Sequence, residues 1–489
     1  MSEKKHISKK ELRRRKRKRA LMIKTGIFCV LLVILGIGIW ALAGGTEKIQ
    51  QKAQEKKDQK TAEVDGSVSS DSTGGAGTPT TKEQIMAEAD ALAQTYDYDG
   101  AIEKLQSVEG AATDADIITK VSEYTSTRDA CVRVNINEVT HIFYHSLVVD
   151  PQKAFYQDNA QTPGFCQWMT TIDEFKAITQ QMYDRGYVMV SLNDLVKKTV
   201  DEDGTVHYTE GDIYLPEGKK AFVLSLDDLS YYHSYDGRGI ASKMIVGDDG
   251  KPTCEYIQDD GTVVTGAYDC IPLMDQFIEE HPDAVYHNAR GTVALTGYDG
   301  ILGYRTDGDY KTRENLTDDQ TAWLNAHPDF DWDKECEEAK KVADAIKADG
   351  WTFASHTWGH IRVGDKPIET IQADTEKWLT YVAPLIGGSD IIIFAHGQDL
   401  SDWHDYTMDN EKFAYLKSQG FNIYCNVDST QYFVQVRDNY LRMGRRNLDG
   451  YRLYQNLYGG GEDRTSDLFD SASVIDPQRP TDPSLYNLG

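Results

Sequence analysis

The sequence predicts an α/β protein whose main body is a barrel of parallel βα units. From Cys131 onward, short apolar runs of strand length alternate with longer segments of helical spacing. Seven such runs occur in series, which favours a barrel over an open sheet. The predicted strands are 139–145, 187–190, 221–226, 291–295, 352–354, 391–394 and 423–427. The predicted helices are 172–185, 271–281, 333–349, 368–387 and 410–419.

Two segments interrupt this alternation. Residues 241–268 contain the turn sequences Asp248-Asp249-Gly250 and Asp259-Asp260-Gly261, which predict one or two inserted β-hairpins. Residues 297–305 read as a glycine-rich loop after a strand. Chemistry in such barrels collects where the strands end, so both segments are expected beside the active face.

The N-terminal region predicts a membrane anchor. Residues 1–24 carry twelve Lys and Arg against two Glu, although the whole chain has a net charge of −26. Residues 25–43 carry no charge and are long enough to cross a bilayer. The basic tail is expected in the cytoplasm, which predicts a single-pass cell-membrane protein with an extracytoplasmic body. A cleaved signal peptide ending at Ala41-Leu42-Ala43 is the alternative, and it exports the same body.

Further domain boundaries follow from composition. Residues 44–82 are polar and low in complexity, which predicts a flexible linker. Residues 83–130 resemble part of a tetratricopeptide-type array, expected to be a spacer or neck whose protein partner is unknown. The main domain is predicted over 131–460, and 461–489 is a C-terminal tail. The acidic body argues against nucleic-acid binding.

Polar side chains follow two of the predicted strands. Asp227 and Asp228 come directly after an apolar run, where such a pair often only caps a turn. His356 and His360 follow the strand 352–354, and their spacing places two imidazoles on one side of a helical turn. Two neutral imidazoles and one carboxylate are a common catalytic zinc set. The sequence therefore predicts a divalent metal, Zn²⁺, on both histidines and one aspartate, with the other aspartate free as a base.

The order of these residues resembles the polysaccharide deacetylases of carbohydrate esterase family 4, the NodB homology domain. The resemblance covers roughly 139–447, through Asp227-Asp228, His356-Thr357-Trp358-Gly359-His360 and Phe394-Ala395-His396-Gly397. It implies a deformed (β/α)7-type barrel that removes N-acetyl groups from amino-sugar polymers, or O-acetyl groups from some esters. It also implies that Asp227 is the general base and that Asp228, His356 and His360 hold the metal.

The sequence departs from the family pattern where a general acid is expected. A proline usually precedes a glycine in the third motif, which here reads His396-Gly397-Gln398-Asp399. The usual histidine after a leucine is missing from 441–450. His396 is the predicted replacement because it follows a strand on the same side of the barrel. His145 and His233, each near a strand end, are alternatives.

Three further residues are candidate contacts of the substrate. Trp358 and Tyr231 lie near the motifs and are expected to stack on sugar faces. Arg445 is expected to bind a carboxylate of the polymer or to orient Asp227, and its alternative is a solvated surface arginine.

The sequence as a whole predicts a metal-dependent hydrolase acting on carbon–nitrogen bonds other than peptide bonds. The predicted reaction removes acetyl groups, N-acetyl favoured, from an amino-sugar polymer of the cell envelope or extracellular matrix. The alternative is a catalytically decayed module that binds glycan or scaffolds envelope proteins. The degraded later motifs favour the alternative, whereas the intact Asp-Asp and His-x-x-x-His motifs favour the enzyme.

Overall fold

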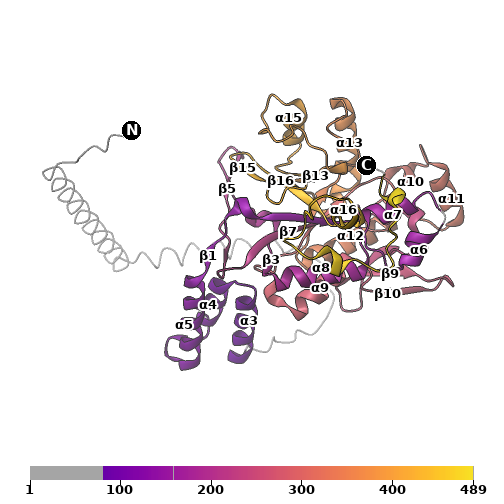
Figure 1. The fold of residues 1–489 in the computed structure, drawn as a ribbon. Coiled ribbons are helices and arrows are strands. Elements are labelled where there is room, and N and C mark those ends of the chain that lie inside the picture. The colour runs from indigo at the N-terminus through magenta and orange to yellow at the C-terminus, as the bar shows by residue number, and fades with distance from the viewer. Residues whose placement is uncertain (1–80, 158, 488–489) are drawn as a thin grey trace, which may run out of the picture. The chain divides into compact units, whose positions relative to one another are not determined.

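The body of the chain is a closed barrel of seven parallel strands (Figure 1). The computed structural model describes residues 81–157 and 159–487. Every neighbouring pair around the barrel is parallel, and β7 closes it by pairing with both β2 and β11. The strands are β2 (Thr140–Tyr144), β7 (Lys220–Asp227), β11 (Thr292–Leu295), β12 (Thr352–Ser355), β13 (Ile391–Ile393), β14 (Ile423–Val427) and β16 (Tyr440–Asn447). The predicted α/β barrel is confirmed.

One of the seven predicted strands lies outside the barrel. The run 187–190 forms β3 (Tyr187–Met189), which pairs with β7 but is not part of the closed ring. The place is taken by β16, which sequence analysis did not predict as a strand because it carries three arginines. Another added strand, β15 (Val434–Arg437), runs antiparallel to β16.

Alternation along the strands divides the core into an interior and an outer layer. On β7, Ala221 and Val223 pack in one cluster with Leu441 and Met443 of β16, inside the barrel. Phe222, Leu224 and Leu226 of β7 pack in a second cluster with the surrounding helices. This period of two puts Asp227 of β7 and Arg445 of β16 on the interior side as well.

Helices cover the outside of the barrel (Figure 1). The helices that follow the neck are α6 (Pro151–Tyr156), α7 (Thr162–Trp168), α8 (Ile172–Asp184), α9 (Cys270–Glu280), α10 (Gly308–Thr312), α11 (Asp318–Ala326), α12 (Trp332–Ala348), α13 (Ile368–Tyr381), α14 (Ala383–Ile386), α15 (Glu411–Ser418), α16 (Gly450–Tyr458) and α17 (Ser471–Val474). The helix α8 begins with a capping box between Thr171 and Glu174, which satisfies two backbone donors.

The predicted insertion is a small antiparallel sheet of three strands. It consists of β8 (Lys243–Val246), β9 (Pro252–Ile257) and β10 (Val263–Gly266). Cys254 on β9 and Cys270 at the start of α9 are both buried free thiols. A further hairpin joins β4 (Val196–Val200) to β5 (Val206–Glu210), and the short strand β1 (Val132–Arg133) pairs antiparallel with β6 (Tyr214–Leu215), far along the chain.

The neck consists of three helices that lie together at one side of the barrel (Figure 1). They are α3 (Lys82–Gln94), α4 (Tyr98–Gln106) and α5 (Ala115–Ala130). The ring of Tyr96 stacks on Tyr286 at 6.5 Å, and its hydroxyl donates to the carbonyl of Asp283. These partners precede β11, so the neck packs at the amino-terminal end of the barrel strands.

The segment after β16 is part of the packed body. Arg479 is buried and pairs with the buried carboxylate of Glu174 on α8, and it also donates to the carbonyl oxygens of Cys166 and Met169. The predicted C-terminal tail therefore packs on the outside of the barrel, against α7 and α8.

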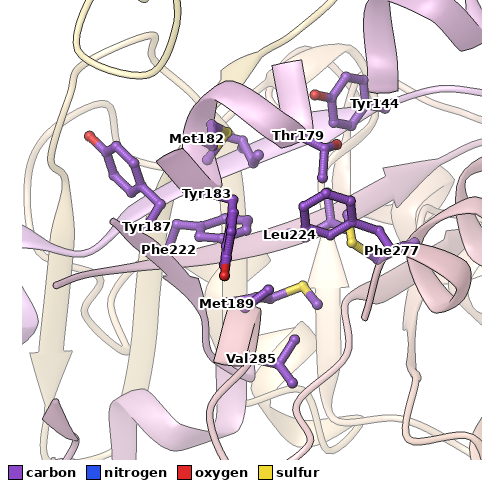
Figure 2. A pocket seen from close by; sticks show the side chains of 13 residues that line it. Tyr144, Thr179, Met182, Tyr183, Tyr187, Met189, Phe222, Leu224, Phe277 and Val285 are labelled. Atoms are coloured by element: carbon purple, nitrogen blue, oxygen red, sulfur yellow. The ribbon is translucent and has the colours of Figure 1, made fainter. Parts of the chain in front are cut away.

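A small apolar cavity of about 20 Å³ lies between α8, α9, β3 and β7. Figure 2 shows that Met182, Met189, Leu224 and Phe277 surround it. Its volume matches about one water molecule, so it is too small for a sugar.

No helix within the described part of the chain is long and apolar enough to cross a membrane. The predicted basic tail (1–24), transmembrane helix (25–43) and all but the last two residues of the linker (44–82) lie outside the described residues.

Candidate metal centre

The candidate site lies where β7 and β12 end at the carboxyl-terminal rim of the barrel. Asp227 is the last residue of β7 and is buried. Asp228 has a positive φ of 55°, a conformation that L-residues seldom adopt, so the chain turns sharply there. This turn sends two adjacent carboxylates in different directions from one strand end.

His356 and His360 lie on a loop, not on the helical turn that their spacing predicted. His356 extends the ladder of β12 by donating its backbone N–H to Leu295. Thr357 and His360 then have positive φ values of 62° and 50°. The carboxylate of Asp374 on α13 accepts the backbone N–H groups of Trp358 and Gly359, at 2.7 and 2.8 Å. The loop is therefore held from outside by a residue that sequence analysis missed.

Asp228, His356 and His360 offer one ligand atom each, and these atoms lie within 4.8 Å of one another. Oδ2 of Asp228 is 3.4 Å from Nε2 of His360. Nδ1 of His356 is 2.7 Å from the carbonyl oxygen of Ile393, which only accepts. Nδ1 therefore carries the hydrogen, and the lone pair of Nε2 is free for a metal. The donor set fits a divalent ion such as Zn²⁺.

Electrostatics favour the metal-binding forms of these groups. Burial would raise the pKa of Asp228, but His360 and His356 outweigh it and lower that pKa. Burial lowers the pKa of His356 and keeps its ring neutral, against the opposing effect of Asp227 and Asp228. A carboxylate and neutral imidazoles are the forms that bind metals.

Asp228, His356 and His360 are called the triad below, and Asp227 lies beside it, with its Oδ2 3.8 Å from Nε2 of His356 and its carboxylate paired with Arg445. Two parallel bonds of 2.7 and 2.9 Å join the guanidinium to the two carboxylate oxygens, and Arg445 is 0% exposed. Burial alone would raise the pKa of Asp227, but Arg445 and His356 hold it well below its usual range. Ser225 also accepts from Arg445 and contacts His141, 3.0 Å away.

Two predicted substrate contacts are corrected. Tyr231 is 1% exposed and its hydroxyl donates to Asp269, so it is a core residue that cannot stack on a sugar. Arg445 is fully buried and paired with Asp227, so it is not free to bind a polymer carboxylate. Of the alternatives predicted for Arg445, orientation of Asp227 is the one that its contacts support.

Trp358 is half-buried next to the triad. The ammonium of Lys377 lies 3.8 Å from the centre of its ring. The ammonium therefore covers one face of the indole, and Gly297 packs closely against its edge.

The three histidines considered for the general acid are differently placed. His396 has its ring 4.3 Å from that of His360, and its Nε2 is 3.1 Å from the carbonyl oxygen of His360. Burial and His360 lower the pKa of His396 to about 4. His145 follows β2, and its buried Nδ1 has no hydrogen-bond partner among the described residues. His233 pairs with Asp299 and Asp319, and both of its ring nitrogens face these carboxylates.

Comparisons with known proteins give one structural likeness. No family model matches the chain, and no curated protein matches it. A Streptococcus pyogenes deacetylase, PplD, solved in complex with acetate, aligns over 66% of this chain and 98% of its own at 11% identity. The TM-score of 0.32 is too low to carry an argument. The assignment of the fold therefore depends on the topology of the barrel strands, and the residues of the candidate site are the basis for any function.

Proposed function

We propose that the chain is a metal-dependent hydrolase that removes acetyl groups, N-acetyl favoured, from an amino-sugar polymer of the cell envelope or extracellular matrix. The observation that carries this proposal is the convergence of Asp228, His356 and His360 beside a second carboxylate, Asp227, that does not join them. The resemblance of these motifs to polysaccharide deacetylases supports the choice of substrate.

The residues of the site divide the work of hydrolysis. Asp228, His356 and His360 would hold the ion, which when bound lowers the pKa of water and polarises the acetyl carbonyl. Asp227 is ionised and accepts the proton of the attacking water. Arg445 fixes the orientation of Asp227 through both oxygens. The bond between the acetyl carbon and nitrogen then breaks, and the amine leaves with a proton from a general acid.

Two observations support His145 over His396 as that acid. His145 follows β2, which lies between the strands of Asp227 and Arg445 in the ring, and its buried Nδ1 makes no bond to the described residues. Nε2 of His396 is already engaged by a backbone carbonyl. His145→Gln is expected to lower kcat by about 10²–10⁴-fold with the metal retained, whereas His396→Gln has a smaller effect. A larger loss of kcat in His396→Gln than in His145→Gln would instead identify His396 as the general acid.

The test of the proposed function is acetate release from a panel of acetylated glycans by the purified chain, with and without chelator. Asp228→Ala and His356→Ala are expected to lose the metal, and Asp227→Asn is expected to keep it and lose acetate release. Activity that survives complete metal removal would reject the metal-dependent mechanism. The alternative of a decayed binding module predicts no acetate release, and the complete donor set argues against it.

The body is further proposed to lie outside the membrane, anchored by residues 25–43. The uncharged run and its basic flank support this. Protease added to intact cells is expected to remove the body and to leave an N-terminal fragment in the membrane.

A further inference from the structure

A second, larger cleft lies beside the metal centre at the same rim of the barrel. Its volume is about 620 Å³, enough for a sugar unit, and it is formed by the loops after β12, β13 and β14. Gly397 lines it, and the preceding residue, His396, lies against the metal-ligand candidate His360. The cleft therefore begins one residue away from the metal centre.

The cleft is lined by more negative than positive charge. Asp365, Asp402 and Asp428 line it, and none of them forms an ion pair with a described residue. A fourth carboxylate, Asp399, is paired with Arg442, the one cationic side chain in the lining. The cleft therefore has three carboxylates available to a cationic ligand.

One nearby cation, Lys412, bonds to the backbone and not to a carboxylate of the cleft. The ammonium of Lys412 donates to the carbonyl oxygens of Val363 and Gly364, at 2.9 and 2.7 Å. These bonds hold the loop that carries Asp365 and leave its carboxylate to accept from Gln398, at 2.8 Å.

Two further side chains indicate a ligand with both polar and flat surfaces. Asn426 lines the cleft and is only 5% exposed, and its Oδ1 has no hydrogen-bond partner among the described residues. Leaving a buried acceptor without a partner costs about 1–3 kcal/mol, so a donor from a ligand would be favourable there. Trp403, by contrast, is 72% exposed at the edge of the cleft, where an aromatic ring suits the face of a sugar.

We propose that this cleft binds a sugar unit with a free, protonated amine, the product unit of the reaction. The proposal rests on the proposed deacetylation, because that reaction converts a neutral acetamide into such an amine. An ammonium group is matched by Asp365, Asp402 and Asp428, and Trp403 contacts the ring. The enzyme would then prefer polymer that is already partly deacetylated, with an acetylated unit at the metal and an amine-bearing unit in the cleft.

The test compares Asp402→Asn/Asp428→Asn with the unaltered full chain. The first measurement is the affinity for a tetramer of glucosamine at mildly acidic pH, where the amines are charged. The double variant is expected to bind about three- to ten-fold more weakly, which corresponds to the loss of two exposed charge contacts. Added salt is expected to weaken binding to the unaltered protein. The control is Glu202→Gln/Asp248→Asn, which removes the same charge from exposed sites outside the cleft and is expected to bind normally.

The second measurement is the steady-state kinetics of acetate release. The unaltered chain is expected to show a lower KM for a partly deacetylated tetramer than for the fully acetylated one. The double variant is expected to lose this difference in KM. If the double variant and the unaltered chain bind glucosamine equally well, or if the control variant loses as much affinity as the double variant, the cleft does not bind the amine as proposed. Absence of acetate release by the unaltered chain rejects the proposed function instead, and does not alter the binding result.

Discussion

At the scale of single residues, the ion pair between Asp227 and Arg445 makes the interior of the barrel sensitive to substitution. Both side chains are buried, so neither charge is stabilised by water if its partner is removed. A buried pair adds little net stability against an apolar pair of the same size, but breaking one costs much. The same pair that orients the proposed base is therefore a structural requirement of the fold.

Arg445→Met is expected to lower the free energy of unfolding by about 3–5 kcal/mol, because it leaves Asp227 charged and unpaired. Adding Asp227→Asn removes that charge, so Asp227→Asn/Arg445→Met is expected to recover part of the loss. Urea unfolding of the four proteins of this cycle measures the coupling. Arg437→Met is the matched control, since Arg437 pairs with Asp405 at the surface and its loss costs less than about 1 kcal/mol. Similar losses in both single variants would contradict the argument.

Two carboxylates that share one guanidinium predict a pH effect on stability away from the site. Asp275 and Asp349 both face Arg290, at 2.8 and 3.7 Å. Burial and the neighbouring Asp349 raise the pKa of Asp275 above its ordinary value of 3.8. The folded state therefore binds this proton more tightly than the unfolded state. The stability that this one group contributes is greatest below pH 3.8 and is lost as the pH rises through the raised pKa of Asp275.

Asp349→Asn is expected to reduce this loss, because an amide can donate to the Asp275 carboxylate. Thermal unfolding at about pH 5 and pH 8 measures the difference in Tm between the two conditions. The difference is expected to be smaller in the variant than in the unaltered chain. Asp344→Asn on α12, the helix that Asp349 caps, serves as control, since Lys347 and Lys340 lower the pKa of Asp344 and it does not titrate in this range. An unchanged pH dependence in Asp349→Asn would show that Asp275 is ionised throughout.

At the scale of elements, the loop 356–360 determines the geometry of the candidate metal ligands His356 and His360. Its shape depends on two backbone N–H groups that donate to Asp374, on a helix that begins after the loop. Outer contacts of this kind typically change metal affinity by about 10–100-fold.

Asp374→Ala is therefore expected to weaken metal binding by about 10–100-fold while the barrel stays folded. A competition titration with a chromophoric chelator measures the affinity, and circular dichroism checks the fold. Glu376→Gln, an exposed change on the same helix, is expected to bind metal normally. Equal metal affinity in both variants would mean that the loop keeps its shape without Asp374.

The strands β7 and β16 and the loop 356–360 show how far the sequence predicts the structure. Apolar strands such as β7 were predictable because alternating residues fill two layers of core. The strand β16 was not, because Arg442, Arg445 and Arg446 look solvated until their partners Asp399, Asp227 and Asp467 are brought to them by the fold. The spacing of His356 and His360 suits a helix. The segment forms a loop instead, held by backbone hydrogen bonds to Asp374, which is distant in the sequence.

At the scale of the whole molecule, the neck and the candidate site lie at opposite ends of the barrel. The neck contacts Asp283 and Tyr286, before β11, whereas Asp227, Asp228 and His356 lie where strands end. If the chain is anchored as proposed, this arrangement places the candidate metal centre and the cleft on the side away from the neck. Such an arrangement suits a polymer that approaches from outside.

The C-terminal segment completes this body, and its removal is the prediction that tests the integrity of the whole fold. Deleting 476–489 removes Arg479 and leaves the buried carboxylate of Glu174 unpaired. The expected loss is at least about 3–5 kcal/mol, seen as a lower Tm and faster proteolysis. Glu174→Gln in the truncated chain removes the charge and still has an oxygen to accept the N–H of Thr171, so it is expected to regain part of the stability. A truncated chain that melts like the full one would show that this segment packs on the barrel without stabilising it.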